Sequence, residues 1–163
     1  GLNGRARTVG SEDAASQVAH HLLVAQAIAV HHRQDFGQAQ ARDTRLLLSV
    51  DDAIKQGRSE GIIGDDITFR FGKGNRGGNG KTIGTDVANR KTNALNKSDV
   101  EACNWVFLSS LKALQEGARG VNATAVVEIV SYYKKREFSS PTEFECHVGT
   151  LMAGVALKGS YAK

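Results

Sequence analysis

The chain has 163 residues, of which 40% are hydrophobic and 23% charged, with 21 Lys and Arg residues against 17 Asp and Glu residues. This length supplies one hydrophobic core of modest size, which excludes two independently folded domains. These residues contain no apolar run of the length that a transmembrane helix needs, and the net charge of +4 permits nucleic-acid binding without arguing for it.

Residues 1–41 differ from the rest because their charges balance, so the whole net charge falls in residues 42–163. An apolar run over residues 22–30 precedes Ala39-Gln40-Ala41, the small-x-small pattern of a signal-peptidase site. We therefore predict a degraded or misread export signal over residues 1–41, a single domain over 42–163, and a periplasmic or secreted protein. The alternative is a disordered or helical N-terminal extension, in which case the protein is cytoplasmic.

Two histidine pairs, His20-His21 and His31-His32, lie in this first segment. Such pairs can ligate a metal ion when they meet across a hairpin. Paired histidines in a polar segment are more often solvated, so we predict no metal site and no cofactor.

The segment from Ser49 to Gly57 predicts a short helix, with Ser49 as its cap and acidic residues in the first turn. Alternating apolar and polar residues predict strands at 67–71 and around 83–87. Because residues 72–80 between them are rich in glycine, we predict that residues 67–90 form a hairpin around a mobile loop.

A long helix is predicted from Ser98 to about Ala118, because Ser98 and Glu101 form a capping box. Apolar side chains recur at helical spacing and predict one buried face, widened by two further residues. These positions are Val100, Cys103, Phe107, Leu111 and Leu114, with Trp105 and Leu108 beside them.

β-branched and aromatic residues predict a strand over 124–133, followed by a turn. Alternation from Glu143, continued by the apolar residues 151–157, predicts a long strand with a bend at Gly149 or Gly154. The order of elements indicates an α+β domain: an antiparallel sheet of about four strands, one long helix packed across a face, and a short N-terminal helix.

Gly80-Lys81-Thr82 looks like the end of a P-loop. A P-loop needs a glycine at the position of Asn75 and a helix after the threonine, because its amides wrap phosphate at a helix N-terminus. The residues after Thr82 instead predict a strand, so we interpret this segment as a glycine-rich loop that binds no nucleotide.

Cys103 lies on the apolar face of the predicted helix, and Cys146 on the apolar side of a strand expected beneath it. An oxidising compartment would favour a disulfide between them, which would stabilise the fold by roughly 3–4 kcal/mol. Two buried free thiols are the alternative.

Aromatic and basic residues follow one another at Tyr132, Tyr133, Lys134, Lys135 and Arg136. Such a run can stack on bases and contact phosphates of single-stranded nucleic acid, but it is also typical of a strand end followed by a solvated turn. We favour the second interpretation. A catalytic pair of Cys146 and His147 is disfavoured because neighbouring strand residues point to opposite faces, and we predict no catalytic residue.

From Arg42 to Lys163 the chain resembles a family of small secreted proteins of Gram-negative bacteria. The resemblance is carried by residues 89–93, 101–108, 131–135, 144–147 and 152–159. Members often carry the label "excinuclease ATPase subunit", which implies an ABC-type ATPase with P-loops, signature motifs and zinc-binding cysteines. The chain contains none of these motifs complete, so its residues do not support the activity that the label implies.

These observations favour a small, exported, non-enzymatic protein of the bacterial envelope, self-associating through a sheet edge. The alternative hypothesis, from the family label, is a DNA-associated protein related to excision repair.

Overall fold

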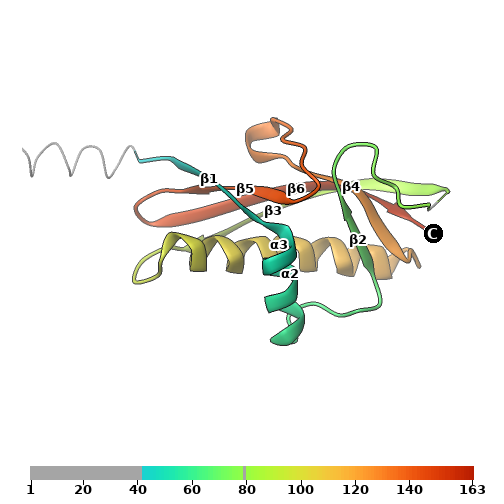
Figure 1. Cartoon of the computed structure of the whole chain (residues 1–163), viewed down its shortest axis with the longest axis horizontal. Helices are drawn as coiled ribbons and strands as arrows, with labels where there is room; N and C mark the ends of the chain where they lie inside the picture. The colour runs from blue at the N-terminus through green and yellow to red at the C-terminus, as the bar shows by residue number, and fades with distance from the viewer. Residues whose placement is uncertain (1–41, 79) are drawn as a thin grey trace, which may run out of the picture. The chain divides into compact units, whose positions relative to one another are not determined.

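A long helix packed on a mixed, six-stranded sheet makes up the part of the chain that the computed structural model describes, residues 42–78 and 80–163 (Figure 1). The predicted export signal and the histidine pairs lie outside the described residues. Arg42–Lys163 forms one compact unit. No helix within the described residues has the length and hydropathy that a membrane-spanning helix needs.

The elements follow one another in the order strand, helix, two strands, helix and three strands, with a short 3-10 turn before the last two strands. They are β1 (Thr44–Ser49), α2 (Val50–Ser59), β2 (Thr68–Phe71), β3 (Thr82–Asn93), α3 (Asp99–Gly120), β4 (Ala125–Ser131), η1 (Tyr133–Lys135), β5 (Glu143–Val148) and β6 (Met152–Ala162).

The C-terminal strand β6 lies at the centre of the sheet. On one side it pairs with β3 along its whole length, and on the other side it pairs with β5 at one end and β4 at the other. β1 continues the sheet antiparallel to β5, and β2 continues it parallel to β4. The predicted antiparallel sheet of about four strands is therefore wrong, because the sheet has six strands and is mixed.

Two predicted connections differ from the structure. In each case a strand pairs with a partner other than the one predicted from the sequence. Residues 67–90 form no hairpin, since β2 pairs with β4 and β3 pairs with β6. The glycine-rich loop between them holds Gly72, Gly74 and Gly77 at positive φ, so the chain turns away from β2. Residues 143–157 form a hairpin rather than one bent strand, and the Gly149 amide donates to the Met152 carbonyl where the chain reverses.

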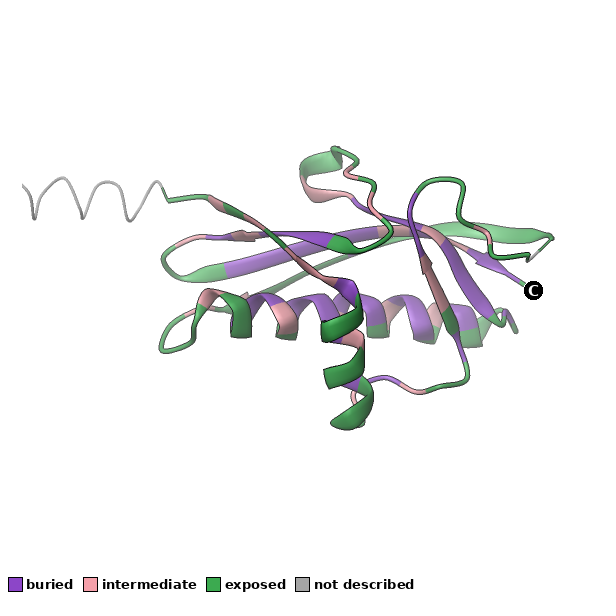
Figure 2. Ribbon diagram, in the orientation of Figure 1, coloured by how far each residue is buried: buried purple, intermediate pink, exposed green. Residues whose placement is uncertain are grey.

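Helix α3 begins where the sequence predicts, because the Ser98 side chain accepts a hydrogen bond from the Glu101 amide. Its sheet-facing side chains are fully buried, including Cys103, Phe107, Leu111 and Leu114 (Figure 2). Val100 and Trp105 are half exposed, contrary to prediction, because α3 has the sheet on one side only.

Both helices leave the other face of the sheet uncovered. On that side the chain between β4 and β5, residues 132–142, folds back over the sheet (Figure 1). Polar side chains of β1 and β5 project from the same face, which makes it the place to look for a functional site.

Candidate functional site

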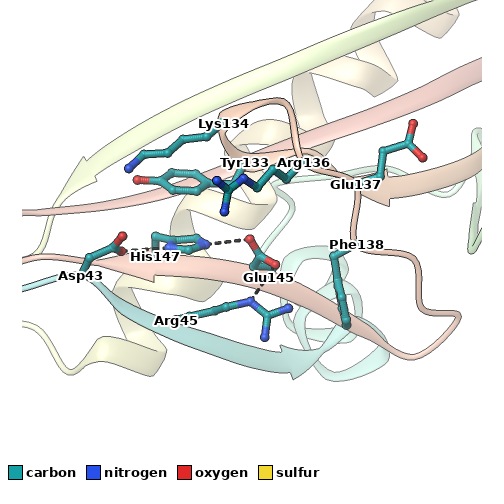
Figure 3. A pocket seen from close by; sticks show the side chains of 9 residues that line it. All are labelled: Asp43, Arg45, Tyr133, Lys134, Arg136, Glu137, Phe138, Glu145 and His147. Carbon is teal, nitrogen blue, oxygen red and sulfur yellow. Dashed lines mark hydrogen bonds and ion pairs between the residues drawn. The ribbon is translucent and has the colours of Figure 1, made fainter.

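A cavity of about 380 Å³ lies on the face of the sheet opposite α3, between β1, β5 and the chain that follows β4 (Figure 3). β5 contributes to it through alternation: Phe144, Cys146 and Val148 are buried, whereas Glu145 and His147 point to the cavity. The separation of the two sides of β5 agrees with the alternation in the sequence.

The His147 ring lies between two carboxylates. Its Nδ1 is 2.8 Å from Asp43 Oδ1, and its Nε2 is 2.6 Å from Glu145 Oε1. A neutral imidazole has one N–H donor and one acceptor nitrogen, whereas a protonated ring donates at both nitrogens. In either form each ring nitrogen faces a carboxylate oxygen, so neither nitrogen is open to the cavity.

Tyr133 covers the His147 side chain, since the two rings stack with centroids 3.7 Å apart and planes 9° apart. Burial raises the pKa of the Tyr133 phenol above its usual value, and the carboxylates of Asp43 and Glu145 add to the effect. The Lys134 ammonium lies 5.5 Å from the centroid of the Tyr133 ring, on a residue with the unusual φ of 53°.

Glu145 is the most buried acid of the cluster, with 9% of its side chain exposed. Its second oxygen accepts from Arg45 Nε at 2.9 Å, and the Arg45 guanidinium lies 5.0 Å from the centroid of the Phe138 ring. A buried carboxylate is costly unless it is paired, and here Arg45 lies on one side of it and the His147 ring on the other.

The predicted nucleic-acid contacts do not form one surface. Tyr133, Lys134 and Arg136 line the cavity. Tyr132 instead lies under the Lys158 ammonium, 4.9 Å from its ring centroid, and Lys158 also pairs with Glu137. Lys135 is exposed. Within the described residues each tyrosine ring already has a partner: His147 and Lys134 for Tyr133, and Lys158 for Tyr132.

The chemistry of this cluster is a closed set of charge pairs. Asp43 and Glu145 are paired with His147, and Glu145 is also paired with Arg45. Among the described residues, no group of three or more His, Cys, Asp or Glu side chains is placed so that it could hold a metal ion. The arrangement holds the two cavity walls together.

The sequence does not predict this cluster as a unit. The alternation along β5 placed Glu145 and His147 on one side, but Asp43 and Tyr133 join them from segments more than ten residues away. Pairing of β1 with β5 brings Arg45 opposite His147, and that pairing leaves no local mark in the sequence.

The two cysteines are joined, as the sequence predicted under oxidising conditions. Cys103 of α3 and Cys146 of β5 form a disulfide with their Cα atoms 5.9 Å apart, and both are fully buried. In the predicted P-loop look-alike, Thr82 is the first residue of β3, so a strand follows Gly80 and Lys81 as expected.

A second candidate is the free edge of β3. Within the described residues this twelve-residue strand pairs with β6 alone, and most of its side chains are exposed. Its other edge therefore carries backbone N–H and C=O groups with no strand beside them, which is the usual template for pairing with another chain.

Comparison of this chain with models of known protein families, with curated proteins and with solved structures finds no match. The family resemblance stays a prediction.

Proposed function

We propose that this chain is an exported, non-enzymatic protein of the bacterial envelope that acts by association through the β3 edge. The observation that carries the proposal is the length of that edge: twelve residues paired on one side only in the described part of the chain. Sheet proteins commonly shorten, bend or cover such edges, and an exposed strand of this length is suited to pairing with another strand.

The disulfide supports the export part of the proposal. It joins α3 to β5 inside the core, where both sulfur atoms are shielded from solvent. Structural disulfides persist in the periplasm and outside the cell and are rare in the reducing cytosol of most bacteria.

The cluster of charged side chains around His147, on the face of the sheet opposite α3, supports a non-enzymatic role. Its acids and bases are turned toward one another, with His147 held at both nitrogens. A general base needs a free acceptor within reach of the substrate proton, and both nitrogens of the His147 ring already face carboxylate oxygens.

Localisation tests the export part directly. Periplasmic and cytosolic fractions of the native host are probed with an antibody to the chain, with a resident marker for each compartment, and free thiols are counted after denaturation without reductant. We expect the protein in the periplasmic fraction or the medium, with no free thiol. Recovery in the cytosol with two reactive thiols would refute it.

A second candidate is nucleic-acid binding, favoured by the basic side chains of Lys134, Lys135 and Arg136 at the open face. The same cavity carries the acids Asp43 and Glu145, which would repel phosphate. Filter binding of single-stranded DNA at two salt concentrations separates the candidates. Retention that falls steeply with salt and is lost in Lys134→Ala would favour nucleic-acid binding over association.

A further inference from the structure

The direction of the backbone groups along β3 follows from its partner strand. Asn89 lies opposite Ala156 of β6, but the Ala156 carbonyl accepts from the Tyr132 amide on the other side of β6. Asn89 and Ala156 therefore exchange no hydrogen bonds, and the N–H and C=O of Asn89 point to the free edge. Since the register runs without a shift from Gly84 to Asn93, the same holds for every odd-numbered residue of this stretch.

Side chains of β3 itself satisfy two of these outward groups. The Val87 amide donates to Asp86 Oδ1 at 2.8 Å, and the Asn89 carbonyl accepts from Arg90 Nη1 at 3.1 Å. An acid therefore caps an outward donor and a base caps an outward acceptor, two residues apart. The two capped groups are complementary to each other.

We infer that β3 pairs antiparallel with β3 of a second copy of this chain, about a two-fold axis at Ala88. In this register Val87 lies opposite Asn89 of the second copy, and the two groups now capped by side chains bond to each other instead. Thr85 lies opposite Lys91 in the same way, so only outward-pointing residues exchange backbone bonds.

The charges select this register over its neighbours. With the axis at Ala88, Asp86 lies opposite Arg90 of the second copy, and symmetry gives the pair twice. The two Asp86–Arg90 pairs are non-hydrogen-bonded pairs, the kind in which opposing side chains lie closest. Opposite charges at such positions favour association. Asp86 and Arg90, which bond to backbone groups in the monomer, thus become partners of each other across the interface.

The residue at the axis also fits. Ala88 is small and buried beneath α3, so two copies meet there without bulky side chains. Asp86 is held ready by a second bond, since its Oδ2 accepts from the Tyr161 hydroxyl at 2.8 Å. This inference rests on the proposed association through β3 and adds the partner, the register and the residues that set it.

Charge reversal tests the register. The full chain, oxidised, is studied by sedimentation equilibrium from micromolar to millimolar concentration at low salt. We expect a dimer whose dissociation constant rises by about ten- to a hundredfold in Asp86→Arg and in Arg90→Asp, because each places like charges opposite twice. The double variant restores opposite pairs and returns to within about threefold of the wild type.

Two variants serve as matched controls. Lys91→Glu makes the same change in charge as Arg90→Asp, one residue along the strand. Because residue 91 lies opposite the uncharged Thr85 of the second copy, we expect the dissociation constant to be unchanged. Tyr161→Phe removes the hydroxyl bond of Asp86 without changing the charge of β3, and its dimer persists. Thermal unfolding of each variant shows that the fold is retained.

Amide hydrogen exchange supplies an independent readout. As concentration rises, the amides of Thr85, Val87, Asn89 and Lys91 become protected, whereas those of the even-numbered residues between them, already bonded to β6, do not change. A dimer whose dissociation constant is unchanged in both charge reversals, or amide protection without this alternation, refutes the register. Association through another register or surface would then remain. A monomer at every concentration refutes both this inference and the association part of the proposed function, and leaves export to its own test.

Discussion

The disulfide gives the most quantitative prediction, because the loop that it closes is known. Cys103 and Cys146 are 43 residues apart in sequence. The chain-entropy model assigns a cross-link of this span a stabilisation of about 4 kcal/mol, since the bond restricts the unfolded chain. The double variant Cys103→Ala/Cys146→Ala should therefore lose about 4 kcal/mol of unfolding free energy. With an unfolding entropy of about 0.25 kcal/mol/K for a domain of roughly 120 residues, Tm falls by about 15 °C.

The assay is guanidinium unfolding of four samples: the wild type and the double variant, each with and without reductant. Reduced wild type is the matched control, because it loses the bond without losing any side chain. Reductant should destabilise the wild type and leave the variant unchanged. Equal stability of oxidised and reduced wild type, within about 1 kcal/mol, would contradict the loop-closure argument.

Three further outcomes follow from local contacts. Ser98→Ala removes the α3 cap and should cost about 1 kcal/mol in urea unfolding, with Ser98→Gly costing less. His147→Ala leaves a buried acid with one fewer partner and should cost about 1–3 kcal/mol, whereas a neutral effect would show that the charge pairs do not stabilise the fold. Burial raises the pKa of Tyr133 and of Tyr161, so their stabilisation is complete below about pH 10 and is lost as pH rises above it. Ultraviolet titration should show late ionisation that moves to lower pH on denaturation and is smaller in Tyr161→Phe.

The elements of this fold are readable in the sequence where the signal is local. The capping box at Ser98 and the helical spacing after it define α3 within two or three residues of its observed ends. The start of α2 at Val50 follows in the same way from the Ser49 cap. Helix signals are short-range because a helix makes its hydrogen bonds four residues apart.

Strand pairing could not be predicted from the sequence, because it joins residues that lie far apart in the chain. β2 and β3 adjoin in sequence but pair with β4 and β6, which follow them by dozens of residues. An alternating pattern states which side of a strand is buried and says nothing about its neighbour. The site shares this limit: the pattern placed His147 opposite Cys146, but only the pairing of β1 with β5 and the fold of η1 bring Asp43 and Tyr133 to it.

The disulfide and the edge proposed for association lie on different sides of β6. The disulfide ties α3 to β5 on one side, while β3 on the other is held by backbone pairing and by Tyr161. Tyr161 reaches Asp86 because Gly117 of α3 has no side chain: a Cβ there would overlap the tyrosine hydroxyl. The core thus positions the acid that caps the β3 edge, so loss of the disulfide should weaken the fold without changing the register at that edge. In the monomer, side chains cap only the Val87 amide and the Asn89 carbonyl of the outward groups. In the proposed dimer these two contacts are exchanged for backbone hydrogen bonds, and the remaining outward groups gain partners.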